Sequence, residues 1–210
     1  MRLHPALFAL AAVAAVPVVA QQMQTPGSNN PAAITGGTYQ ADPAHTLVRW
    51  QVDHLGFSPY FGMFGDVTGT LTLDPRNPAA SKVDVTIPVS KVTTASAGLT
   101  AHLLRAGADG AKPDFFGAAP ADARFVSTAV TVQGQTATIT GNLTLNGVTR
   151  PVTLAARFYG AGTMPAQMGG KENVGFTATT TIKRSEFGVA GALPLVSDAV
   201  TLDIVAAFQK

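Results

Sequence analysis

Histidine is the residue type in this sequence best suited to acid–base or metal chemistry, and three histidines follow the first twenty residues: His45, His54 and His102. His45 and His54 lie at the two ends of one predicted strand, so a straight chain at ~3.3 Å per residue would hold them up to ~30 Å apart. In that geometry they cannot share a metal ion. A bend of the chain after residue 52 would leave a metal-linked or quinone-linked redox role for His54 and His102 open.

Other signs of catalysis are scarce. The 210 residues contain no cysteine, which excludes a thiol nucleophile, a disulfide bond and a lipid-modified N-terminal cysteine. The sequence has no G-x-S-x-G motif, and no glycine-rich phosphate loop precedes a helix. We therefore expect a protein that is not an enzyme and that holds no metal or organic cofactor.

The first twenty residues have the features of a secretory signal peptide. Arg2 provides the positive charge, and the run at residues 5–19 is almost wholly apolar. This run is shorter than the ~20 residues of a membrane-spanning helix. The sequence therefore predicts cleavage near Ala20, export of the chain and a mature chain without a membrane span. A flexible lead is expected at residues 21–37 and a single domain at residues 38–210.

The charge of the chain is low and evenly spread. The formal net charge is +2, and only 12% of the residues are charged. Lys and Arg are scattered and form no basic stripe, so the sequence does not indicate a nucleic-acid partner. A field that steers acidic partners is not implied either.

Apolar and polar residues alternate with a period of two in nearly every later segment, which is typical of half-buried β-strands. The dipeptide Asn146-Gly147 lies between two such segments and favours the type I′ turn of a hairpin. The fold class is therefore all-β, with eight predicted antiparallel strands. Eight strands can close into a barrel that holds packed side chains or one ligand, although a two-sheet sandwich would show the same alternation. The eight segments are residues 48–52, 67–73, 83–89, 125–132, 137–145, 152–158, 176–182 and 200–208.

Residues 96–120 break this alternation. The stretch from Gly98 to Arg105 has the composition of one or two helical turns, and residues 106–112 are rich in Gly and Ala. A long irregular segment in a compact domain is usually functional or mobile. We expect this segment to form a short helical or loop cover over one end of the barrel.

The apolar faces of the predicted strands combine small residues with large ones. Small inward residues leave volume for a ligand, but they also occur in filled barrels, where they fit the taper. A ligand cavity and a structural domain with a filled core therefore both stay open. A cavity with these walls would hold an apolar molecule, because each buried methylene contributes about 0.8 kcal/mol. The inward residues expected to contact it are Val48, Trp50, Leu71, Ile87, Ile139, Gly141, Leu143, Leu154, Phe176, Ile182 and Leu202.

Five motifs follow one another along residues 39–210. They read Tyr39-Gln-Ala-Asp-Pro-Ala-His45-Thr-Leu-Val-Arg-Trp50-Gln-Val-Asp-His54-Leu-Gly-Phe-Ser58, then Asp114-Phe115-Phe116, Phe125-Val-Ser-Thr128, Gly141-Asn-Leu-Thr-Leu-Asn-Gly147-Val-Thr-Arg150-Pro151-Val and Lys183-Arg-Ser-Glu-Phe-Gly-Val189. In content and order this set resembles the signatures of the YceI family, lipocalin-like periplasmic proteins that bind polyisoprenoids.

The resemblance implies an extended eight-stranded antiparallel lipocalin-like barrel with a hydrophobic channel. It implies a long polyisoprenoid ligand, free or as the tail of a quinone, which the protein carries or sequesters without catalysis. A homodimer and a transient contact with a membrane protein stay open. Carried over by motif, the further residues expected near the channel are His54, Phe57, His102, Phe115, Phe116 and Phe187.

The sequence departs from the family in the expected cover. Leu99-Thr100-Ala101 stands where the family often has an Arg-Asp pair before the histidine that matches His102. The spacer from His102 to Asp114 is also longer. The cover is therefore the part of the domain for which the resemblance is least informative.

Overall fold

The computed structural model of the protein describes residues 24–210. The predicted signal peptide and its cleavage site near Ala20 lie outside the described residues. None of the helices in the described part is long and apolar enough to cross a membrane. The strands are β1 (Gly37–Ala41), β2 (Leu47–His54), β3 (Ser58–Phe64), β4 (Thr68–Leu73), β5 (Lys82–Ile87), β6 (Ala123–Gln133), β7 (Thr136–Leu145), β8 (Val148–Thr163), β9 (Glu172–Lys183) and β10 (Ala199–Gln209).

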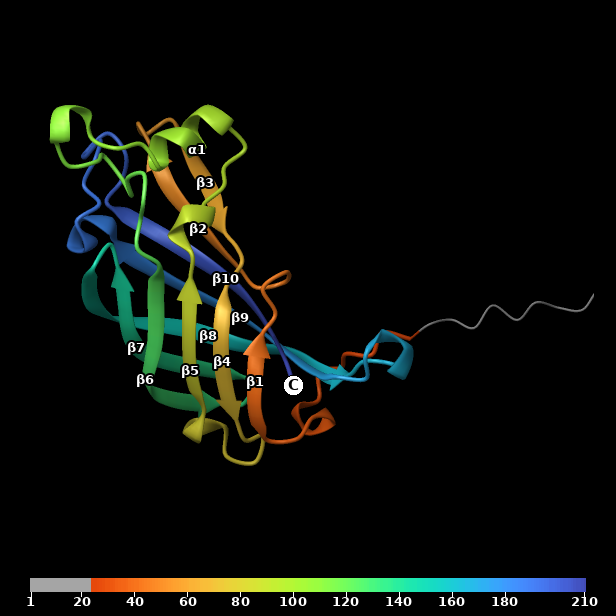
Figure 1. Ribbon diagram of the computed structural model, residues 1–210. Coiled ribbons are helices and arrows are strands. Elements are labelled where there is room, and N and C mark those ends of the chain that lie inside the picture. Colours follow the sequence, from red (N-terminus) through yellow and green to blue (C-terminus); the bar gives the residue numbers. More distant parts are fainter. Residues whose placement is uncertain (1–23) are drawn as a thin grey trace, which may run out of the picture.

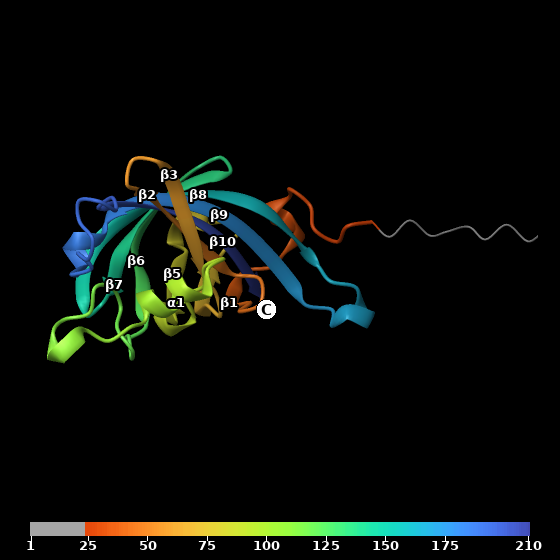
Figure 2. The same ribbon diagram turned by 90° about the horizontal axis from the view of Figure 1, so that it is seen from above.

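Eight of these strands close into an antiparallel barrel (Figure 1). The ring runs β1-β4-β5-β6-β7-β8-β9-β10, and β10 pairs with both β9 and β1. Figure 2 shows the strands curving around a common interior. The predicted fold class is therefore confirmed, and the two-sheet sandwich is excluded.

The strands β2 and β3 extend the barrel at one end. β1 pairs with β10 through Gln40 and Ala41, and β2 continues along the same edge of β10 from Leu47 to Gln51. β3 pairs with β2, and in the same way β4 pairs with β1. Two of the barrel strands are thus interrupted, and this is why ten segments make an eight-stranded barrel.

Thr46 joins the gap between β1 and β2 to β10. Its hydroxyl is buried, donates to the carbonyl of Ala207 at 2.9 Å and accepts from the N–H of Ala207 at 3.1 Å. The N–H of Asp42 donates to the same carbonyl at 2.8 Å. The side chain of Thr46 therefore replaces the backbone pairing that the gap would lose.

The one α-helix in the described residues, α1 (Ala97–Leu103), lies at the end of the barrel that β2 and β3 extend (Figure 1). It begins after Ser96, whose hydroxyl accepts a hydrogen bond from the N–H of Leu99, as is typical of an N-cap. The expected short helical cover is present. The 3-10 helices are η1 (Pro31–Ala33), η2 (Pro78–Ala80), η3 (Val89–Lys91), η4 (Ala108–Gly110), η5 (Ala166–Met168) and η6 (Arg184–Phe187).

The flexible lead predicted at residues 21–37 does not extend that far. Ser28 forms a β-bridge with Ala161, and Ile34 is buried in the core. The turn at residues 31–33 is capped by the side chain of Asn30. The polar composition of this segment suggested flexibility, but these contacts fix it against β8 from residue 28 onward.

The buried core is divided into three clusters along the barrel wall. One centres on Tyr39 and Phe208, a second on Val89, and a third on Phe125 and Phe187. The clusters are packed against the strands, and they leave the middle of the barrel to the cavity described below.

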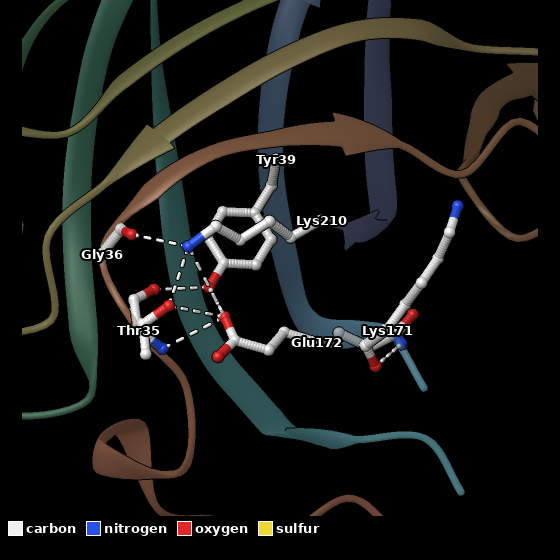
Figure 3. Close-up of polar contacts among 7 residues, drawn as sticks. Thr35, Gly36, Tyr39, Lys171, Glu172 and Lys210 are labelled. Carbon is white, nitrogen blue, oxygen red and sulfur yellow. Dashed lines mark hydrogen bonds and ion pairs between the residues drawn. The ribbon is translucent and has the colours of Figure 1, made fainter. Parts of the chain in front are cut away.

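Four side chains hold β1 together with the ends of β9 and β10 (Figure 3). The hydroxyl of Tyr39 donates to Oε2 of Glu172 at 2.7 Å, and the same oxygen accepts from the N–H and the hydroxyl of Thr35. Nζ of Lys210 donates to Oγ1 of Thr35 at 2.7 Å and to the carbonyl of Gly36 at 2.8 Å. We call Thr35, Tyr39, Glu172 and Lys210 the seam cluster.

The pKa values of this cluster show how closely its members are coupled. Burial raises the pKa of Tyr39, and the hydrogen bond to Glu172 raises it further. The hydrogen bond from Tyr39 is the main cause that lowers the pKa of Glu172, with further lowering from Thr35 and Lys210. Glu172 is therefore ionised and Tyr39 neutral over the whole physiological range.

Glu172→Gln is expected to lower the free energy of unfolding at pH 7 by about 1–2 kcal/mol, because the charge-assisted hydrogen bonds of the seam cluster weaken. The pKa of Glu172 is lower in the folded state than its value of about 4.3 in the unfolded chain. Glu172 therefore stabilises the folded state at a pH above that unfolded value, and this stabilisation is lost as the pH falls through the pKa of the folded state. Urea unfolding at pH 7 and pH 2.5 tests this: the difference from wild type should shrink at pH 2.5. Glu186→Gln, at the other glutamate, should match wild type at both.

Candidate functional site

A cavity of about 700 Å³ occupies the interior of the barrel. Every strand of the barrel except β1 contributes to its wall, as do β2 and β3, and α1 and the segment at residues 189–196 cover one end. The wall is almost wholly apolar, and no Asp, Glu or Lys lies in it. This volume is within the range of small-molecule sites, about 300–1,000 Å³, so the alternative of a filled core is excluded.

All but three of the residues predicted to contact a ligand line this cavity. Their side chains come from seven strands, from α1 and from the segment that follows it. Those that line it are Val48, Trp50, His54, Leu71, Ile87, His102, Phe115, Phe116, Ile139, Leu143, Leu154, Phe176, Ile182 and Leu202.

Phe57, Gly141 and Phe187 do not line the cavity. Phe57 is 88% exposed at the turn between β2 and β3. Gly141 faces inward, but the ring of Phe125 lies directly over it: a Cβ there would be 2.4 Å from a ring carbon. Phe187 is buried in the wall, where it packs in one cluster with Phe125. The volume expected above Gly141 is thus filled by an aromatic ring.

The structure adds lining residues that the sequence pattern did not identify. Tyr60 and Phe64 line the cavity from β3, a strand whose apolar residues do not alternate with polar ones. Leu99 and Leu103 line it from α1. Together with His102, these two leucines have the i, i+3, i+4 spacing of one helix face. This spacing is the feature of the sequence that could have identified them as lining residues.

Four alanines, not the glycines, leave the barrel interior open. They lie on β7, β8, β9 and β10, and three occupy directly paired positions: Ala137 opposite Ala156, and Ala156 opposite Ala178. All four line the cavity, namely Ala137, Ala156, Ala178 and Ala206.

Arg184 is buried at the α1 end of the cavity, where it holds the covering segment. Its guanidinium donates to the carbonyls of Val189 at 3.0 Å, Gly191 at 2.8 Å, Val196 at 2.8 Å and Ser197 at 2.9 Å. Burial lowers the pKa of Arg184. Because these donors are engaged by the backbone, Arg184 fixes the covering segment in place.

His102 lies at the same end and belongs to a polar cluster with Asp114 and Arg105. Nε2 of His102 is 3.0 Å from Oδ2 of Asp114, and Nη2 of Arg105 donates to that oxygen at 3.1 Å. The hydrogen bonds from His102 and then Arg105 lower the pKa of Asp114. Arg105 comes from the long spacer, so the unusual part of the cover supplies a cation beside His102.

Histidines are not grouped for metal binding in the part of the chain that the structure describes. His54 lines the cavity, whereas His45 is exposed and paired with Asp42 at 2.7 Å. Residues 24–210 contain no cluster of three or more His, Cys, Asp or Glu that could hold a metal ion.

Two buried side-chain polar atoms of the described residues have no hydrogen-bond partner, Nε1 of Trp50 and Oγ of Ser81. Both residues line the cavity. Buried polar groups are normally paired, so these two atoms are exceptions in the wall of the cavity.

Comparison with known proteins identifies the family. The sequence profile of the YceI-like domain matches residues 39–208. The chain belongs to the YceI family. Protein YceI of Salmonella arizonae is 42% identical over 161 residues, which cover 76% of this chain and 79% of the relative.

Solved structures show the same fold. The crystal structure of the YceI protein of Campylobacter jejuni is 30% identical, with a TM-score of 0.60, and the match covers 75% of this chain and 89% of that one. A polyisoprenoid binding domain from Saccharophagus degradans is 12% identical, with a TM-score of 0.52, and the match covers 83% of this chain and 98% of that domain. The resemblance seen in the five motifs is thus confirmed.

Gly141→Ala is expected to lower the free energy of unfolding by about 1–3 kcal/mol, because the new methyl group would overlap the ring of Phe125. Gly98→Ala is the matched control: it lies in α1, where the nearest atom to a new Cβ is 3.9 Å away. That change should raise stability by about 0.5–1 kcal/mol. Urea unfolding of both variants tests the packing, and equal stability of Gly141→Ala and wild type would contradict it.

Proposed function

We propose that this protein binds one long polyisoprenoid, free or as the tail of a quinone, and carries or sequesters it in the periplasm. The observation that carries the proposal is the apolar cavity of about 700 Å³ along the barrel interior. Its wall offers extensive apolar contact and no carboxylate or lysine.

The physical basis of binding is burial of the hydrocarbon chain. Each methylene that leaves water contributes about 0.8 kcal/mol, so a long tail gains affinity without specific polar contacts. Branched isoprene units suit a wall of branched side chains that is recessed where the alanines lie. The name of the Saccharophagus degradans domain, which shares the fold, supports the same ligand class.

The polar lining residues favour an amphiphilic ligand. His54, His102 and Arg184 lie at the α1 end, and Gln135 and Arg157 lie where the hairpin of β6 and β7 meets β8. Most of the remaining wall is apolar. A polar head group would therefore lie at one end of the barrel, with the tail between the ends.

We infer that the protein acts by binding alone. His102 at the cavity is paired with Asp114, which suits a structural role or a contact with a head group. The signal-like first twenty residues support export of the chain. Neither a redox step nor a resident cofactor is required for this role.

Ala178→Leu is expected to weaken uptake of a long-chain isoprenoid quinone at least tenfold, because the added side chain displaces two or more methylenes at about 0.8 kcal/mol each. Thr181→Leu, on the outer face of the same strand, is the matched control and should bind like wild type. Quenching of tryptophan fluorescence, followed through Trp50 in the wall, measures binding. Equal affinity of the two variants would exclude the barrel interior as the binding site.

A further inference from the structure

The end of the barrel that carries α1 also presents a group of exposed apolar side chains. They come from the turn between β2 and β3 and from the segment that precedes β10. Phe57 is 88% exposed, Leu195 61%, Leu55 43% and Leu193 36%. We call Leu55, Phe57, Leu193 and Leu195 the tip surface.

Backbone contacts place the two segments side by side. The N–H of Leu55 donates to the carbonyl of Leu195 at 2.8 Å, and His54 forms an antiparallel bridge with Val196. The N–H of Ser197 donates to the carbonyl of Asp53 at 3.0 Å. The four apolar side chains therefore belong to one surface and not to two separate loops.

This surface adjoins the end of the cavity that α1 and residues 189–196 cover. His54, Ala192 and Val196 line the cavity, and each is adjacent in sequence to a residue of the tip surface. The turn and the covering segment lie at the α1 end of the barrel in Figure 1. A molecule that leaves the cavity at this end would therefore pass beside the tip surface.

The backbone of the turn makes its leucine unusual. Leu55 and Gly56 have φ of 61° and 69°, and the N–H of Phe57 donates to the carbonyl of His54 at 3.1 Å. Positive φ at both central positions of a turn favours Asn, Asp or Gly, and a bulky side chain is disfavoured there. The fold thus tolerates an unfavourable conformation to keep an apolar side chain exposed.

The covering segment also has an apolar residue at positive φ, Ala192. Of the five non-glycine residues with positive φ in the described chain, three are Asp or Asn, and the two apolar ones are Leu55 and Ala192. Both lie at the tip. The four hydrogen bonds from buried Arg184 hold the segment that carries Leu193 and Leu195. The exposed leucines are therefore presented by a fixed backbone.

We propose that the tip surface docks on a lipid bilayer, with the α1 end of the cavity facing the membrane. Residues 55–59 and 190–196 contain no charged side chain, and Ser58 is the one polar side chain among them. An uncharged, protruding group with an aromatic ring at its apex suits insertion into the acyl boundary of a bilayer. A protein partner with a flat surface would pack poorly against the protruding ring of Phe57.

Docking lets an isoprenoid pass between bilayer and cavity without exposing its tail to water. This second step rests on the proposed function, whereas the docking itself does not. The site therefore deepens the carrier role by naming the surface at which loading and release take place.

Co-sedimentation with vesicles of phosphatidylethanolamine and phosphatidylglycerol at 3:1 tests the docking. The double variant Phe57→Ser and Leu195→Ser should bind the vesicles at least tenfold more weakly than wild type. The control is Tyr159→Ser with Met168→Ser, which removes side chains that are 77% and 64% exposed on β8 and η5, outside the tip surface. This control should bind like wild type.

Leu55→Asn separates docking from folding. Asn tolerates positive φ better than Leu, so this variant should melt at a higher temperature than wild type while it binds vesicles more weakly. A purely structural role of Leu55 would move stability without moving vesicle binding.

Unchanged vesicle binding by the double variant, or failure of wild type to co-sediment, would overturn the proposal. A shift from dimer to monomer in the double variant with unaltered vesicle binding would also overturn it, and would assign the surface to a second copy of the chain. Uptake of an isoprenoid quinone from solution is measured in parallel. Its absence in wild type that still binds vesicles would reject the proposed function and leave the docking intact.

Discussion

The closed ring of backbone hydrogen bonds is the constraint on which the rest of the structure depends. Eight strands set the width of the barrel, so side chains decide only how much of the interior is filled. Closure falls on a short seam, because β1 pairs with β10 through two residue pairs only. Thr46 extends that seam, and the seam cluster around Tyr39 and Glu172 secures its end. The cavity exists because this seam is held.

Small inward residues have two different roles in this barrel. The rings of Trp50 and Phe125 lie over Gly62 and Gly141, so these glycines allow large side chains to pack and contribute no free space. The alanines on β7 to β10 stand beside open volume instead. At the α1 end, Arg184 donates to backbone carbonyls of the covering segment. Apolar side chains of that segment are therefore left to form the tip surface. Apolar surface therefore continues from the interior to the outside at one end.

Alternation predicted the strands and most of the cavity wall because each strand has one face toward the interior. It failed where that rule is broken. β3 has apolar residues on both faces, since Tyr60 lines the cavity while Phe61 is exposed, and β1 is only five residues long. A bulge between Ser127 and Ala129 shifts the inward positions of β6. Phe57 and Phe187 were assigned to the channel by family motif. A motif indicates that a residue matters to the family, but it does not indicate which way the side chain points. No local pattern predicts that a ring covers Gly141, because that contact joins two strands.

The central claim is that the barrel interior holds a long isoprenoid in the cell. Native mass spectrometry of the protein purified without detergent, followed by analysis of the organic extract, tests it most directly. The account predicts a complex heavier than the chain by one lipid, and an extract whose lipid fragments with the repeat of isoprene units. A protein that carries no lipid in repeated preparations, or one that carries only fatty acids, would contradict it.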